Sequence, residues 1–254
     1  MTNPILHKIV ETKKEEIAGI DLTSLPGRDV PLHPFAESLK KSSLTVIAEC
    51  KKGSPSAGIL RPNYSAAAIA KEYERCGASA ISVLTDKNYF YGSLDDLYEV
   101  SRSVSIPVIR KDFIIHESQI QEAYAYGASA ILLIIRILEK SRLRELFLYA
   151  KTLGLGVLVE THNEREVDLA LELGMDVIGI NTRDLDTFAI HPDLVKELAP
   201  KIPKNLIRVA ESGIHSHKDM LDYQNIVDSV LIGTYFMKEE DITVAYRKLT
   251  TGIY

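Results

Sequence analysis

The chain has 254 residues, of which 46% are hydrophobic and 26% are charged, a composition typical of a globular protein. Its formal net charge of −5 provides no overall basic surface, so we expect no nucleic-acid partner. The longest apolar run, residues 130–135, is far shorter than the roughly 20 residues that cross a membrane, and no apolar signal core follows the N-terminus. We therefore predict a cytoplasmic protein that does not bind membranes.

Cysteine and histidine spacing gives no sign of a disulfide framework or a metal site. Cys50 and Cys76 form no CxxC pair, and the seven histidines include no HExxH motif. We expect reduced thiols, no metal and no cofactor.

The first 44 residues differ in pattern from the rest of the chain. A charge-rich amphipathic helix is predicted over residues 4–20, followed by a segment that contains Pro26, Pro31 and Pro34. We expect an N-terminal extension that packs on the main body or forms a mobile lid. If it caps the functional site, its deletion should reduce turnover more than stability.

From Thr45 onward, short apolar runs alternate with longer segments of helical periodicity. The predicted strands are 45–49, 80–84, 108–111, 130–135, 157–160, 177–181, 207–211 and 229–232. The predicted helices include 65–76, 94–104, 117–126, 141–153, 164–173 and 192–199. The pattern predicts an α/β fold, a (βα)8 TIM barrel, as a single domain over 1–254 with 1–44 as its N-terminal helical extension. A doubly wound open sheet is the alternative, although its GxGxxG fingerprint is missing.

Glycines recur where a helix should end just before a strand. Gly77, Gly127 and Gly174 each precede a predicted strand by a few residues, and the first two begin the same GASAI sequence. Glycine at such a position adopts the left-handed conformation that terminates a helix.

Polar residues follow the predicted strands at their carboxyl ends, where barrel enzymes place their chemistry. They are Glu49, Lys51, Lys111, Glu160, Asn181, Glu211 and Ser212. Strand side chains alternate, so Glu49 and Lys51 share one face, whereas Arg110 and Asp112 should point away from Lys111 toward the helices. Because unpaired buried charges cost several kcal/mol, such a cluster favours a functional site over a purely stabilising role.

Small residues after the last two strands suggest a phosphate site. Ser212-Gly213 and Gly233-Thr234 would let backbone N–H groups approach an anion, and Ser54-Pro55-Ser56 could add a donor, although each is also compatible with a simple turn. His162 lies two residues after Glu160 and could reach the mouth, although a loop histidine is the favoured interpretation. His215 and His217 are interpreted as surface or helix-entry residues.

Seven motifs occur in a fixed order along the chain. They are ECKKGSPS at 49–56, SVLT at 82–85, GSL at 92–94, PVIRKDFI at 107–114, VLVE at 157–160, GINTRDL at 179–185 and AESGI at 210–214. With this set, the chain resembles the indole-3-glycerol-phosphate synthase family over nearly its whole length.

The resemblance implies a (βα)8 barrel that converts 1-(2-carboxyphenylamino)-1-deoxyribulose 5-phosphate to indole-3-glycerol phosphate in tryptophan biosynthesis, with loss of CO2 and water. It implies that Lys111 is a general acid and that Glu160 transfers protons. The further active-site positions that it implies are Glu49, Lys51, Asn181, Arg183, Glu211 and Ser212. Its phosphate-binding positions are Ser54, Gly213, Gly233 and Thr234, and its ring-contacting positions are Phe90, Phe113 and Leu132.

The chemistry of this reaction suggests individual roles. We expect Lys51 to contact the substrate carboxylate and, by crowding, to lower the pKa of Lys111. Glu160 is the expected base of the dehydration, and either lysine could protonate the leaving hydroxyl. Asn181 and Glu211 are expected to orient substrate hydroxyls or the lysines.

Two other functions are compatible with the same residues. One is another phosphate-binding barrel enzyme, such as a sugar-phosphate isomerase or an aldolase with a Schiff base on Lys111. The other is a non-catalytic barrel that binds a metabolite or a protein. In each case we expect a monomer or a weak homo-oligomer.

Overall fold

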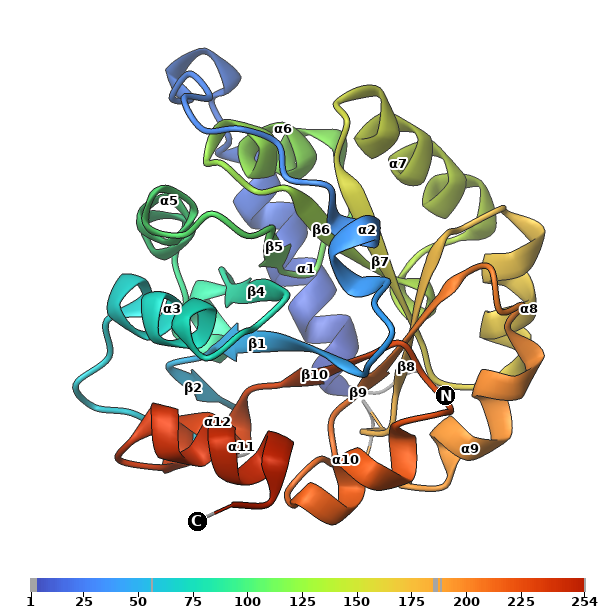
Figure 1. The fold of residues 1–254 in the computed structure, drawn as a ribbon. Coiled ribbons are helices and arrows are strands. Elements are labelled where there is room, and N and C mark those ends of the chain that lie inside the picture. Colours follow the sequence, from blue (N-terminus) through green and yellow to red (C-terminus); the bar gives the residue numbers. More distant parts are fainter. Residues whose placement is uncertain (1–3, 56, 185–186, 188, 254) are drawn as a thin grey trace.

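The computed structural model describes residues 4–55, 57–184, 187 and 189–253. Within them, eight parallel strands close into a barrel in the order β1, β10, β9, β8, β7, β6, β5, β4 (Figure 1). Their bounds are β1 (Thr45–Cys50), β4 (Ala80–Leu84), β5 (Val108–Lys111), β6 (Ala130–Ile134), β7 (Gly156–Thr161), β8 (Val177–Asn181), β9 (Ile207–Glu211) and β10 (Ser229–Ile232). The predicted closed barrel is confirmed, and the open sheet is excluded because β1 pairs with both β10 and β4.

Helices surround the strands on the outside of the barrel (Figure 1). They are α3 (Ala66–Arg75), α5 (Leu94–Ser103), α6 (Glu117–Ala125), α7 (Lys140–Thr152), α8 (Glu164–Glu172), α9 (Leu194–Leu198), α10 (His217–Tyr223), α11 (Thr234–Lys238) and α12 (Ile242–Thr251). Shorter elements are the antiparallel pair β2 (Gly53–Ser54) and β3 (Gly58–Ile59), with α4 (Lys87–Phe90), η2 (Ile135–Ile137) and η3 (Ala199–Lys201).

The six helices predicted from periodicity are all present, with ends within two residues of those expected. Side-chain caps define several starts, such as Ser65 for α3 and Ser93 for α5. Gly77, Gly127 and Gly174 have φ values of 97°, 95° and 72°, as predicted for helix ends. The strand predicted over 130–135 ends one residue early because the chain turns into η2.

Side-chain alternation divides the core into two layers. Outward-facing strand residues pack against the helices, and inward-facing ones, such as Ile47, Ile109 and Leu158, fill the barrel. Toward the carboxyl ends of β1, β5, β7, β8 and β9, the inward series then becomes polar. The residues two positions beyond an inward apolar one include Glu49, Lys111, Glu160 and Glu211. The barrel core therefore ends directly beneath a charged floor.

The N-terminal extension consists of α1 (Pro4–Ala18), η1 (Leu22–Ser24) and α2 (Phe35–Leu39). The first helix ends two residues earlier than predicted, and α2 was not expected within the proline-containing segment. Phe35 and Leu39 of α2 are buried among the apolar residues of the barrel interior, and Phe35 lies against Gly156 at the amino end of β7. The second helix therefore closes the barrel at the end opposite to the charged floor.

The first helix lies across the carboxyl ends of β4 and β5. Lys13 is only 1% exposed, and its Nζ lies 2.7 Å from Asp86 and 2.9 Å from Asp112. Leu6 and Ile9 pack with the apolar residues of the barrel interior. This helix is therefore anchored on the mouth by both apolar contacts and ion pairs, which argues against a freely mobile lid.

None of the helices in the described part of the chain combines the length and the hydrophobicity that a membrane crossing requires.

Candidate active site

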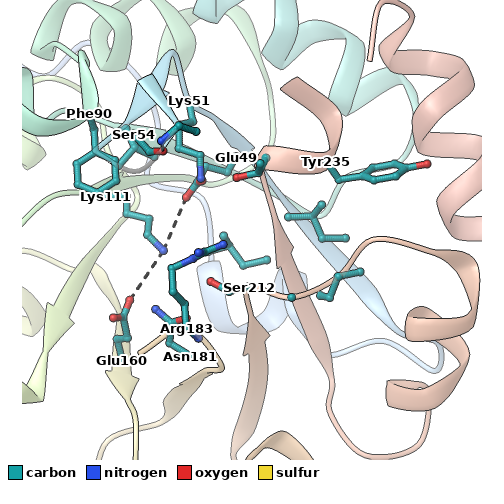
Figure 2. A pocket seen from close by; sticks show the side chains of 18 of the residues that line it. Glu49, Lys51, Ser54, Phe90, Lys111, Glu160, Asn181, Arg183, Ser212 and Tyr235 are labelled. Atoms are coloured by element: carbon teal, nitrogen blue, oxygen red, sulfur yellow. Dashed lines mark hydrogen bonds and ion pairs between the residues drawn. The ribbon is translucent and has the colours of Figure 1, made fainter. Parts of the chain in front are cut away.

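A cavity of about 360 Å³ opens at the carboxyl ends of the barrel strands (Figure 2). This volume is in the range of small-molecule sites. The predicted site residues that line it are Glu49, Lys51, Ser54, Phe90, Lys111, Phe113, Leu132, Glu160, Asn181, Arg183, Ser212, Gly213, Gly233 and Thr234. Glu211, the remaining predicted residue, does not line the cavity but contacts Lys111. The structure thus brings together side chains from strands that are far apart in the sequence.

Lys111 is surrounded by carboxylates. Its Nζ lies 2.9 Å from Glu211, 3.7 Å from Glu49 and 3.9 Å from Glu160, and Figure 2 shows the ammonium between Glu49 and Glu160. Lys51 lies on the other side of Glu49, with its Nζ 2.8 Å from Oε1 of that residue. The two lysines therefore share Glu49 rather than facing each other without a counter-charge.

The expected lowering of the Lys111 pKa is wrong. Burial would lower this pKa, but the carboxylates of Glu211, Glu49 and Glu160 outweigh burial and raise it. The three carboxyl groups lie within 4 Å of the ammonium, and Lys51 is itself paired with Glu49. The raised pKa favours the protonated form of Lys111.

The buried carboxylates beside Lys111 are driven to different pKa values. Burial would raise the pKa of Glu160, but the nearby His162 imidazole and the charge of Lys111 lower it. Burial raises the pKa of Glu211, and the nearby negative charge of Glu160 adds to the effect. Glu160 therefore stays ionised, whereas Glu211 takes up a proton more readily.

His162 lies in the loop between β7 and α8, as predicted, and its side chain is buried against Glu160. Its Nε2 lies 3.2 Å from Oε1 of Glu160, and its Nδ1 lies 3.3 Å from Glu166. These carboxylates raise its pKa to about 9 against the opposing effect of burial. The i, i+2 spacing from Glu160 was the signal in the sequence, because it places both side chains on the same side of the chain.

Two glycines make room for the charged floor. A Cβ on Gly179 would lie 2.1 Å from Oε1 of Glu211, and a Cβ on Gly233 would lie 2.3 Å from Oε1 of Glu49. Gly233 has a φ of −130°, so close approach rather than turn geometry requires glycine there. Each glutamate thus occupies the space that a side chain at its glycine neighbour would need.

The small residues after β9 and β10 lie at the cavity edge. Ser212 and Gly213 have φ values of 68° and 73°, and the first of these is unusual for a residue with a side chain. Thr234 begins α11 beside them, and Ser54 and Pro55 line the same cavity. Ser56 and Leu185, which belong to the motifs above, lie outside the described residues.

One side of the cavity is apolar. The rings of Phe90 and Phe113 lie 6.1 Å apart at a tilted angle, and Leu132 lines the same cavity. Asp86 fixes the start of α4, which carries Phe90, by accepting hydrogen bonds from the backbone N–H groups of Tyr89 and Phe90. An aromatic substrate ring fits this lining.

Arg110 and Asp112 have different partners, although both lie on the opposite face from Lys111. Arg110 donates to the backbone oxygen of Gln119 at 2.6 Å and to Glu122 at 3.0 Å, so it braces α6 as predicted. Asp112 accepts a hydrogen bond from Arg110 at 3.2 Å, which fits the expected role beside the helix layer, and it also binds Lys13 of the extension and lines the cavity, which was not expected.

Sequence reasoning did not identify some of the residues around the cavity. His215, interpreted as a surface or helix-entry residue, is exposed and also lines the cavity, and Tyr235 and Lys238 line it as well. No pattern in the sequence distinguishes them from ordinary helix residues. Among the described residues, no group of three or more His, Cys, Asp and Glu side chains is arranged to hold a metal ion.

Comparison with known proteins relates this geometry to a family. The model of the family described as indole-3-glycerol phosphate synthase matches residues 5–249. Proteins with that name from Leptospira interrogans and Sulfurimonas denitrificans are 51% and 48% identical to the chain. The alignments cover 96% of both chains in the first case, and 98% of this chain and 99% of the relative in the second.

A solved structure of thiamine phosphate pyrophosphorylase from Pyrococcus furiosus has a TM-score of 0.58 at 18% identity. The match covers 81% of this chain and 93% of that one, and it supports the fold alone. The family match and the two close relatives extend over almost the whole chain. The chain therefore belongs to the indole-3-glycerol phosphate synthase family.

Proposed function

We propose that this cavity binds 1-(2-carboxyphenylamino)-1-deoxyribulose 5-phosphate and converts it to indole-3-glycerol phosphate, with Lys111 as the acid of ring closure. The family consists of decarboxylating lyases of tryptophan biosynthesis. The observation that carries the assignment of Lys111 is the position of its Nζ within 4 Å of three carboxyl groups, at the floor of a cavity with one apolar side.

The lining suggests how the substrate lies. Its phosphate would occupy the edge formed by Gly213, Gly233 and Ser54, where backbone N–H groups and a hydroxyl can donate to an anion. Its aromatic ring would lie against Phe90 and Phe113. The ketone then lies between these two ends, within reach of Lys111.

In the first step, the ring carbon that bears the carboxylate attacks the ketone carbon and forms a C–C bond. The ketone oxygen receives a proton from Lys111 and becomes a hydroxyl, since an alkoxide is far more basic than an amine. The carboxylate then leaves as CO2, and the electron pair of the broken bond restores the aromatic ring. We assign Lys51 to the substrate carboxylate, because its stem places a cation on the same inward face as Glu49.

In the second step, the new hydroxyl leaves as water and the adjacent methylene carbon loses a proton. Glu160 is the proposed base, because it stays ionised beside His162 and Lys111. Asn181 and Glu211 orient substrate hydroxyls or the lysines, and Arg183 adds a cation to the cavity wall. The proton for the leaving hydroxyl comes from Lys51, or from Lys111 after Lys111 has taken up a proton again from solvent.

The test is to add the substrate and follow indole absorbance and fluorescence. We expect the wild-type protein to form product and Lys111→Ala to lose roughly 100-fold or more in kcat, the scale of a lost general acid. Lys14→Ala, which removes an exposed lysine of α1, is the matched control and should leave kcat unchanged. Circular dichroism should be the same for all three proteins.

The other outcomes identify the alternatives. Absence of indole product at high enzyme concentration would refute the proposed function. Near-normal kcat in Lys111→Ala with a large loss in Lys51→Ala would transfer the acid role to Lys51. Borohydride trapping of a substrate adduct would favour an aldolase, and tight binding without turnover would favour a non-catalytic barrel.

The cytoplasmic location and the monomeric or weakly associating state remain predictions. Size-exclusion chromatography over a range of protein concentrations tests the second: we expect the mass of one chain at low concentration, and any larger species only at high concentration.

A further inference from the structure

His162 bridges two carboxylates at the end of β7. Its side chain is 2% exposed, with Nε2 toward Glu160 and Nδ1 toward Glu166 at 3.2 and 3.3 Å. The two carboxylate oxygens of Glu160 face different cations. Oε1 faces His162, and Oε2 lies 3.9 Å from Nζ of Lys111. The imidazole therefore contacts the proposed base on the side away from the reacting ketone.

Glu166, on the far side of the imidazole from Glu160, is held in place by several hydrogen bonds. Glu166 accepts a hydrogen bond from the backbone N–H of His162 at 2.7 Å and another from Nδ2 of Asn163 at 2.7 Å. Its own N–H donates to Oδ1 of Asn163 at the start of α8, and Arg136 lies 3.5 Å from its Oε1. Because Glu166 is fixed to the first turn of a helix, it can hold the imidazole in one orientation.

We propose that His162 is a positioning residue for Glu160, which orients the carboxylate so that one oxygen faces Lys111 and the substrate, and that Glu166 anchors His162 for this task. The inference rests on the proposed function of Glu160. In this arrangement, Glu166 on α8 holds His162, and His162 in turn orients the proton-transfer group Glu160 on β7. Misplacement of a reacting group by about 1 Å can cost up to 100-fold in rate, so this support should be measurable.

The charges around the imidazole favour its protonated form. They are Glu160 on β7, Glu166 on α8, Arg136 beside Glu166 on η2, Lys111 beyond Glu160 on β5, and Glu211 on β9. The two carboxylates in contact raise the pKa of His162 to about 9 against burial. At neutral pH the imidazole is therefore a cation, and it loses its proton and its hold on Glu160 as the pH rises through about 9.

The test compares kcat against pH for four proteins that all carry the complete chain. They are the wild type, His162→Gln, Glu166→Gln and the control His217→Gln, whose histidine contacts the backbone oxygen of Leu249 far from Glu160. In the wild type we expect kcat to fall on the alkaline side near pH 9. In Glu166→Gln this fall should move to lower pH, because a carboxylate that raises the His162 pKa has been removed.

In His162→Gln we expect the fall near pH 9 to disappear and kcat at neutral pH to drop roughly 10- to 100-fold, with KM changed by less than about threefold. The acid limb should move to higher pH, because Glu160 loses the cation that keeps it ionised. Thermal melts show whether each variant is folded, and Glu166→Gln tests the idea even if His162→Gln is unstable.

An alkaline limb that is the same in all four proteins would overturn the proposal, as would a His162→Gln variant with wild-type kcat and pH profile. Failure of the proposed function looks different. In that case the wild type itself forms no indole product, or Glu160→Gln retains full kcat, before any comparison among the histidine variants is made.

Discussion

Replacement of Lys13 by Met tests how strongly the extension is held on the mouth. The Lys13 ammonium lies within 3 Å of Asp86, Asp112 and Glu16, and Met keeps much of the apolar stem while it removes the charge. Removal of one partner from a buried ion pair costs about 3–5 kcal/mol, because the remaining carboxylates stay buried. We expect a loss of about this size in the free energy of unfolding of Lys13→Met at pH 7.

The pH dependence follows from the carboxylates around Lys13. Burial would raise the pKa of Asp112, but Arg110 and Lys13 lower it from 3.8 to about 2. This shift stabilises the fold by about 2 kcal/mol above pH 3.8, and the effect is lost as the pH falls through about 2. Burial already raises the pKa of Asp86, and without Lys13 that carboxyl should take up a proton more readily. Protonation relieves the buried charge, so the deficit of Lys13→Met should be smaller at pH 4 than at pH 7.

Urea denaturation of the wild type, Lys13→Met and Lys14→Met at pH 7 and pH 4 measures these differences. Lys14 is the matched control, because its side chain is 60% exposed and its ion pair with Glu11 is worth at most about 1 kcal/mol. The reasoning is refuted if Lys13→Met is no less stable than Lys14→Met at pH 7, or if its deficit grows at pH 4.

Further outcomes follow from the site and the extension. In Gly233→Ala, the added Cβ would displace Glu49, so steady-state kinetics should show a lower kcat as well as a higher KM; a change in KM alone would contradict this displacement. Sulfate or inorganic phosphate should compete with substrate in inhibition assays, because either anion fits the cavity edge at Gly213, and noncompetitive inhibition would place the phosphate elsewhere. Deletion of residues 1–44 should lower Tm and cause aggregation, because it removes Phe35 and Leu39 from the barrel interior; a stable but slow truncated protein would instead support a cap with no structural role.

The strands and the polar residues at their ends were predictable because each depends on local sequence. Alternation fixes which residues of a strand face inward, so the cluster around Lys111 follows once the barrel closes. Its pKa was not predictable from the pair of lysines alone, since the sequence does not show how close Glu211 and Glu160 approach. The sequence did show that three glutamates and only one other lysine lie at the strand ends around Lys111. This charge balance favours a raised pKa for Lys111.

Long-range contacts account for what the sequence did not reveal. Lys13 belongs to a charge-rich helix, and its burial depends on Asp86 and Asp112, which the chain reaches only after more than seventy residues. The second helix of the extension is short and follows a proline, so local propensity does not predict it; packing of Phe35 into the barrel stabilises it.

The close approach of Gly179 to Glu211, and of Gly233 to Glu49, restricts the order in which this site can change. An alanine at Gly179 overpacks the floor while Glu211 is present, but once Glu211 has been shortened the remaining close contact is Leu158, at 3.2 Å. At Gly233 an alanine would still lie 2.9 Å from Cβ of Glu49 after that side chain is shortened. The effects of substitutions at Gly179 and Glu211 are therefore not additive, and a mutational path that begins with Gly179 passes through an overpacked protein. Anyone who redesigns this barrel for another reaction should change the acidic side chain first and the glycine afterwards.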